Sequence, residues 1–111
     1  MVPGSTNKML AQMRRGAIEY CVLALLREQD RYGLELARTL AEADGLVTSE
    51  GTVYPLLTRL HREGLIDATW EESPNGPPRR YYRITRDGRA ALKVFCTQWE
   101  RFRTTVDKIL A

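Results

Sequence analysis

The amino-acid sequence predicts a mainly α-helical fold with one small β-hairpin and a long C-terminal helix. Apolar residues recur at helical spacing through residues 7–64 and again through residues 86–111. Between these segments, residues 66–85 alternate between apolar and polar side chains around a loop rich in proline and glycine. The chain of 111 residues is long enough for one domain with a modest core.

The N-terminal segment predicts a tail followed by a helix. Residues 1–6 carry no pattern and predict a flexible tail. Residues 7–28 predict a helix that is apolar on two sides, so it must be covered on two sides. The stripe assigned to the core comprises Ile18, Val22, Leu25 and Leu26. The second stripe, which needs a cover of its own, comprises Met9, Met13, Ala17 and Tyr20.

A second helix is predicted after a polar turn at residues 30–32. Asp30 is expected to cap this helix, and Gly45 to end it in a left-handed conformation just after Asp44. Its buried face comprises Gly33, Leu36, Ala37 and Leu40.

The central helix of the predicted fold lies between Ser49, a good N-cap, and Gly64, a good C-cap. Its buried face comprises Val53, Leu56, Leu57 and Leu60. Pro55 conflicts with a regular helix that starts at Ser49, because it removes a backbone hydrogen bond in the second turn. Either Gly51 absorbs the distortion or the regular helix begins nearer Thr52; we expect a start near Ser49 with a loosened first turn.

The exposed face of this helix predicts binding to the major groove of DNA. Together with Ser49 it presents Thr52, Tyr54, Thr58, Arg59 and Arg62. These side chains offer hydroxyls, a ring and guanidinium groups, which suit base edges and phosphates. An ordinary amphipathic surface helix is the alternative interpretation of this stretch alone.

The alternating segment predicts an antiparallel hairpin. On the first strand, Ile66, Ala68 and Trp70 point one way, and Asp67, Thr69 and Glu71 the other. After a loop at 72–79, Arg80, Tyr82 and Ile84 oppose Tyr81, Arg83 and Thr85. Helices followed by a hairpin in this order predict a winged helix-turn-helix domain at residues 7–85, in which Arg79 and Arg80 of the wing hold DNA phosphates.

Residues 86–111 predict a dimerisation helix that Thr85 caps. Its apolar residues repeat in steps of three and four, which is a heptad seam. The seam comprises Leu92, Phe95, Trp99, Phe102, Val106 and Ile109. We expect this seam and the second stripe of the first helix to bury each other across a two-fold axis in a homodimer. The alternative is a tail helix that folds back on its own domain.

Several strings of the sequence resemble the PadR family of transcriptional regulators. They are Tyr32-Gly-Leu-Glu-Leu36, Ser49-Glu-Gly-Thr-Val-Tyr-Pro-Leu-Leu-Thr-Arg-Leu60, Glu63-Gly-Leu-Ile66, Trp70, Arg80-Tyr-Tyr-Arg-Ile-Thr85 and Gly88. The single C-terminal helix is similar to that of the smaller subfamily. The resemblance implies a bacterial repressor that dimerises through its first and last helices and leaves a palindromic operator in double-stranded DNA when a small molecule binds.

The resemblance also suggests an effector site. In a multidrug-sensing branch of the family, a tryptophan of the last helix stacks on planar aromatic ligands at the dimer centre, and Trp99 falls at the matching place. The walls of such a slot would comprise Met9, Met13, Tyr20, Phe95 and Phe102. A dry dimer core filled by the same side chains is the alternative, and the sequence leaves both open.

The composition argues against other classes of function. One histidine, no nucleophile elbow and no phosphate-binding glycine loop predict that the protein is not an enzyme, and we expect no cofactor and no metal. With no bilayer-length apolar run and no signal peptide, we expect a cytoplasmic protein without membrane contact. Two alternatives to DNA binding with ligand control stay open, a winged helix that binds only proteins and a redox switch through Cys21 and Cys96.

Overall fold

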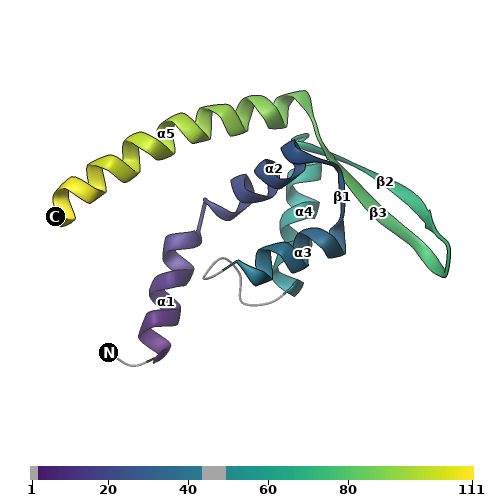
Figure 1. The fold of residues 1–111 in the computed structure, drawn as a ribbon, viewed down its shortest axis with the longest axis horizontal. Helices are drawn as coiled ribbons and strands as arrows, with labels where there is room; N and C mark the ends of the chain where they lie inside the picture. The colour runs from purple at the N-terminus through teal and green to yellow at the C-terminus, as the bar shows by residue number, and fades with distance from the viewer. Residues whose placement is uncertain (1–2, 44–49) are drawn as a thin grey trace.

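The computed structural model describes residues 3–43 and 50–111 of the chain, and Figure 1 gives its arrangement. The elements are α1 (Pro3–Arg14), α2 (Ile18–Glu28), β1 (Arg31–Tyr32), α3 (Gly33–Glu42), the 3-10 turn η1 (Glu50–Thr52), α4 (Val53–Arg62), β2 (Ile66–Ser73), β3 (Gly76–Ile84) and α5 (Arg86–Leu110). The predicted fold class is confirmed: helices α2, α3 and α4 and a small antiparallel sheet form a winged helix-turn-helix, and a long C-terminal helix follows.

The expected single helix over residues 7–28 is two helices. Helix α1 begins at Pro3, inside the segment expected to be a tail, and α2 begins at Ile18. Between them Gly16 has φ +84°, a left-handed conformation that glycine adopts without the steric cost of a side chain. The break turns α1 away from α2, so the second apolar stripe is divided between two helices (Figure 1).

The core lies between α2, α3, α4 and one face of the sheet. The predicted stripes of α3 and α4 are buried, with Leu56 partly buried. Among the residues predicted for the dimer seam, Leu92 is 3% exposed and belongs to this core. The prediction that Leu92 faces a partner is therefore wrong in this structure, because Leu92 is buried in the core of its own chain.

The sheet has a third strand that the sequence did not reveal. Its order is β1-β3-β2, and β1 pairs with β3 through Arg31↔Tyr82 and Tyr32↔Tyr81. Asp30 does not cap α3 as predicted, since the N-cap is Tyr32 and the Asp30 carboxylate accepts a hydrogen bond from Arg83 Nε at 3.1 Å. The loop of the hairpin is also shorter than predicted, because β2 continues to Ser73 and β3 begins at Gly76.

Both ends of α4 have clear physical causes. The regular helix begins at Val53, after the 3-10 turn η1, and not near Ser49 as expected; Pro55 therefore lies in the first turn of α4, where no intrahelical partner is lost. At the other end, the Gly64 N–H donates to the His61 carbonyl and the Leu65 N–H to the Leu60 carbonyl, with Gly64 at φ +79°. This Schellman motif confirms the predicted C-cap. The predicted caps at Ser49 and Gly45, and Asp44 with them, lie outside the described residues.

Helix α5 begins at the predicted cap and extends away from the body of the domain (Figure 1). The Thr85 hydroxyl accepts a hydrogen bond from the Gly88 N–H at 3.0 Å. Gly88 is required for close packing, because a Cβ at this position would overlap the backbone carbonyl of Leu65. Within the described residues, no helix combines the length and apolar character needed to cross a membrane.

Candidate nucleic-acid interface

The outward face of α4 is polar, and its back is buried in the core. Thr52, Thr58 and Arg62 are exposed, whereas Val53, Leu57 and Leu60 on the opposite side are fully buried. The Thr58 hydroxyl donates to the backbone carbonyl of Tyr54 at 3.2 Å. Because the apolar side of α4 is buried in the core, its polar side is held facing outward.

Tyr54 lies at the flank of this face and contacts the start of α3. Tyr54 is 42% exposed, and its Cε1 would lie 3.3 Å from a Cβ added to Gly33. The absence of a side chain at Gly33 therefore allows α4 to approach the N-terminus of α3 closely. Tyr54 stays partly accessible at the surface.

Arg59 lies at the edge of this outward face, and its side chain is 43% exposed. Its Nη2 lies 3.3 Å from Oε2 of Glu19 on α2, and the Glu19 side chain is only 19% exposed. Residue 59 lies about 100° around α4 from Thr58 and about 60° from Arg62, on the flank nearest α2. The structure thus gives Arg59 an intramolecular partner at the flank of the face predicted to contact DNA.

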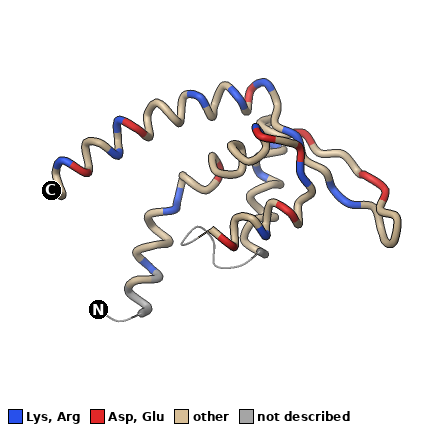
Figure 2. The backbone as a smooth tube through the Cα atoms, in the orientation of Figure 1, with Lys and Arg blue, Asp and Glu red and all other residues tan. Residues whose placement is uncertain are grey.

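The two arginines predicted for the wing project from opposite faces of the hairpin. Figure 2 shows the basic residues of β3 and the acidic residues of β2 side by side. The Arg80 guanidinium lies over the Trp70 ring at 5.0 Å from its centroid, and the Arg79 guanidinium over the Tyr32 ring at 5.7 Å. Both are in the range of cation–π contact, which holds a flexible arginine in a defined place.

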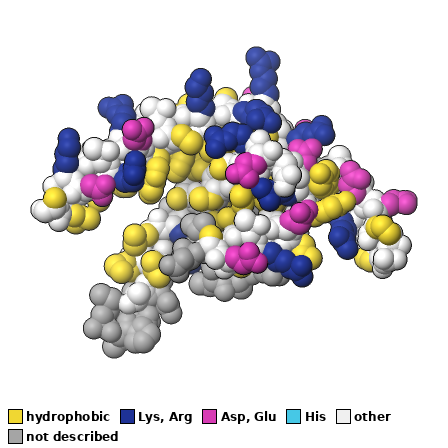
Figure 3. Space-filling model, viewed as in Figure 1, with side chains coloured by type: hydrophobic (Ala, Val, Ile, Leu, Met, Phe, Trp, Pro, Cys, Tyr) yellow, Lys and Arg dark blue, Asp and Glu magenta, His cyan; other side chains and the backbone are white. Residues whose placement is uncertain are grey.

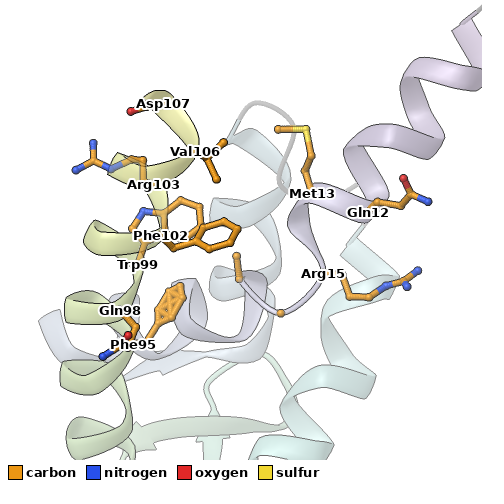
Figure 4. Close-up of a pocket in the computed structure, with 12 residues that line it drawn as sticks. Gln12, Met13, Arg15, Phe95, Gln98, Trp99, Phe102, Arg103, Val106 and Asp107 are labelled. Carbon is orange, nitrogen blue, oxygen red and sulfur yellow. The ribbon is translucent and has the colours of Figure 1, made fainter. Parts of the chain in front are cut away.

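A second candidate site is an apolar cleft between the α1–α2 junction and α5. Figure 3 shows hydrophobic side chains along the side of α5 that faces α1 and α2. The larger part of the cleft has a volume of about 630 Å³, and Figure 4 shows Met13 opposite Phe102 and Val106 across it. A neighbouring part of about 450 Å³ is lined by Tyr20. Both parts share Met13, Ala17, Phe95 and Trp99.

Four aromatic rings form a ladder along this cleft. Tyr20 of α2 stacks on Phe95 of α5 at 4.1 Å with an interplanar angle of 2°. Phe95 and Trp99 follow at 5.8 Å and 18°, then Trp99 and Phe102 at 6.1 Å and 27°. Near-parallel rings of this kind are suited to stacking on a further flat ring. Met9, which was expected on the walls, does not line either part.

Comparison with known proteins decides the family. A family model described as "Transcriptional regulator PadR-like family" matches residues 22–94. The chain belongs to the PadR-like family of transcriptional regulators. A PadR family regulator of Eggerthella lenta has a solved structure with a TM-score of 0.84 and 34% identity, covering 96% of this chain and 93% of that one.

Two further relatives agree with this assignment. A PadR-like regulator of Bacillus cereus has a solved structure with a TM-score of 0.78 and 39% identity, covering 89% of this chain and 96% of that one. A transcriptional regulator of Mycobacterium tuberculosis is 34% identical over 83 residues, which are 75% of this chain and 76% of the relative. As a member of the PadR-like family, the chain is a DNA-binding transcriptional regulator, and the match includes α4 and the wing.

The two cysteines of this PadR-family chain lie in the cleft rather than on the DNA-binding side. Cys21 and Cys96 both line its smaller part, and Cys96 is exposed. Burial raises the pKa of the Cys21 thiol above its ordinary value, which keeps the sulfur protonated and poorly nucleophilic. This environment weighs against a redox switch that requires both thiols.

Sequence reasoning missed several residues of the two sites. Glu19, the partner of Arg59, is 40 positions away in sequence and carries no local signal. Polar residues that line the cleft were also missed: Gln12 of α1, Arg15 of the turn after it, and Gln98, Arg103 and Asp107 of α5. The helical positions of Gln98, Arg103 and Asp107 beside the apolar seam are a signal that would have identified them.

Proposed function

We propose that this PadR-family chain is a ligand-responsive repressor that binds a palindromic operator as a homodimer. The observation that carries the DNA-binding part is α4, a short helix with a buried apolar back and an exposed front of hydroxyls and Arg62. The polar groups of this front match the donors and acceptors of base edges and phosphates.

The direct contacts proposed for DNA are the outward residues of α4 and the wing. Thr52, Tyr54, Thr58 and Arg62 would enter the major groove, and Ser49, which precedes them in the sequence, is proposed as a further contact. The wing carries Arg79 and Arg80, whose positive charge attracts the DNA to this side of the domain, and at least one of them would contact a phosphate. We assign Arg59 to holding α4 on α2, because its guanidinium is already engaged by Glu19.

A homodimer is supported by apolar surface that this chain leaves uncovered. Trp99 is 45% exposed, Phe102 63% and Ile109 76%, and all three lie on one side of α5. Met13 of α1 is 67% exposed across the cleft. Contiguous exposed apolar surface of this kind marks an interaction site, and a second copy offers the matching surface by two-fold symmetry. Phe95 and Val106, which are partly buried, would complete the interface.

The effector proposed for the cleft is a planar aromatic molecule. The volumes of about 630 and 450 Å³ are in the range of small-molecule sites, and the walls are mostly apolar. Phe95, Trp99 and Phe102 present near-parallel rings, and Met13 adapts its shape to different ligands. A dry dimer core made by the same residues is the competing arrangement, and ligand titration distinguishes the two.

Helix α2 connects the two proposed sites. Tyr20 stacks on Phe95 in the cleft, while its neighbour Glu19 pairs with Arg59 of the recognition helix. A ligand that separates Tyr20 from Phe95 would therefore move α2 and, through Glu19, α4. It would release the operator only to the extent that it binds the released arrangement more tightly.

A salt titration tests the DNA-binding part. Binding to a fluorescently labelled duplex is measured by anisotropy over a series of salt concentrations for the wild type, Arg62→Ala and the matched control Lys93→Ala. Lys93 is exposed on α5 and faces away from the apolar seam. We expect Arg62→Ala to weaken binding and reduce the salt slope by about one unit, and Lys93→Ala to leave both unchanged. Equal slopes for all three proteins would contradict the proposed interface.

A further inference from the structure

The two faces of the wing differ in charge. Neighbouring residues of a strand point to opposite faces, so the pairs Ile66↔Ile84, Ala68↔Tyr82 and Trp70↔Arg80 share the face that packs on the helices. We call this the helix-side face. Its inner positions, including Ile66 and Tyr82, belong to the core. Farther out along the hairpin, Trp70 is 66% exposed.

The opposite face is poorly suited to a polyanion. It pairs Asp67 with Arg83 and Glu71 with Arg79, so its charges alternate, and Arg83 is also bound to Asp30 at 3.1 Å. A hollow of about 400 Å³ on this side is lined by the carboxylates of Asp30, Asp67 and Glu71, together with His61 and the Arg83 that Asp30 already binds. Phosphates approaching this surface would meet these negative charges at short range.

The helix-side face has no acidic residue at its paired positions. Of the six residues in the three pairs named above, Arg80 alone is charged. Its guanidinium rests on the indole of Trp70 at 5.0 Å from the ring centroid. The indole restricts the arginine to few conformations, so less conformational freedom is lost when the guanidinium binds a phosphate.

We propose that Trp70 and Arg80 form one DNA-contacting unit of the wing, in which the indole holds the guanidinium against a phosphate and lies against the DNA backbone itself. Arg79, although adjacent in sequence, faces the acidic side and does not contact DNA. This inference rests on the proposed DNA-binding mode of the wing. It assigns to Trp70 a contact role and distinguishes two neighbouring arginines.

The direct test uses Trp70 as a fluorescent reporter. The chain has two tryptophans, Trp70 and Trp99, so the part of the emission that the wild type shows and Trp70→Phe lacks belongs to Trp70. We expect addition of a random-sequence 30-base-pair duplex to quench and shift this emission over the same concentration range in which anisotropy reports binding. Unchanged emission while anisotropy rises would overturn the inference and leave DNA binding intact. Absence of any anisotropy change, in this variant and in the wild type, would overturn the proposed function as well.

Adjacent variants provide the second test. Arg80→Ala should lower the salt slope of binding by about one unit, and Arg79→Ala should leave it unchanged. Trp70→Leu should weaken binding about two- to fivefold on every duplex, the range expected for loss of an exposed cation–π contact, whereas Trp70→Phe should retain most of the affinity. In an Arg80→Ala background, Trp70→Leu should cost less than it does alone, because part of its effect passes through Arg80. Equal losses for Arg79→Ala and Arg80→Ala would contradict the assignment.

Discussion

The ion pair between Glu19 and Arg59 gives the sharpest prediction about the recognition helix. Arg59→Met removes the cation but keeps most of the apolar stem, so Glu19 is left without its partner. Glu19 is 19% exposed and Arg59 43% exposed, and the pair is 3.3 Å apart. We expect the loss to lower the free energy of unfolding by about 1 kcal/mol, the upper end of the range for exposed pairs, since solvent screens Arg59.

The same variant should affect DNA binding in a way that separates two roles. If Arg59 holds α4 on α2, the affinity for DNA should fall by up to about fivefold, equally on the operator and on a random duplex. The reason is that the pair contributes about 1 kcal/mol to holding α4 in its binding position. If Arg59 instead reads a base, the operator alone should lose about 1–3 kcal/mol of binding. The assays are urea unfolding and fluorescence anisotropy on both duplexes.

A charge swap makes the test decisive. The double variant Glu19→Arg with Arg59→Glu recreates the pair in the opposite sense. We expect it to recover most of the stability and DNA affinity that Arg59→Glu or Glu19→Arg loses alone, with a favourable coupling energy in the double-mutant cycle. A swap that restores stability but not operator affinity would contradict the positioning role. It would favour a direct contact of Arg59 with DNA.

Three further outcomes are expected. Phe102→Glu, at a side chain 63% exposed in one chain, should leave the fold intact by circular dichroism and yield monomers in sedimentation; a stable dimer would contradict the seam. Gly88→Ala should destabilise the domain by at least about 2 kcal/mol in urea unfolding, because its Cβ would overlap the carbonyl of Leu65; unchanged stability would contradict the close packing. Maleimide should modify Cys96 well before Cys21 at neutral pH, since burial raises the pKa of the Cys21 thiol; equal rates would contradict its burial.

The parts of the fold set by local spacing were predictable from the sequence. The stripe through Leu36 and Leu40 and the one through Leu57 and Leu60 identify buried faces, because helical periodicity depends only on neighbouring residues. The Thr85 cap is likewise a local interaction, formed with a backbone N–H three residues away.

The parts that depend on distant contacts were not predictable. Gly16 breaks the first helix, but a single glycine inside an apolar pattern is compatible with a continuous helix as well. Strand β1 is two residues long and exists because Tyr32 pairs with Tyr81, far along the chain. The heptad pattern correctly marks one face of α5, yet it does not say that Leu92 is covered by its own domain and Phe102 is not.

Selection of bound sequences from a random duplex library, followed by sequencing, shows whether the protein binds two DNA half-sites as a dimer. We expect enrichment of a two-fold symmetric site whose half-sites are about 34–36 Å, or one helical turn, apart. The same selection with Phe102→Glu should yield no symmetric site. Enrichment of a single unpaired half-site by the wild type, or the same symmetric site from both proteins, would contradict binding to two half-sites as a dimer.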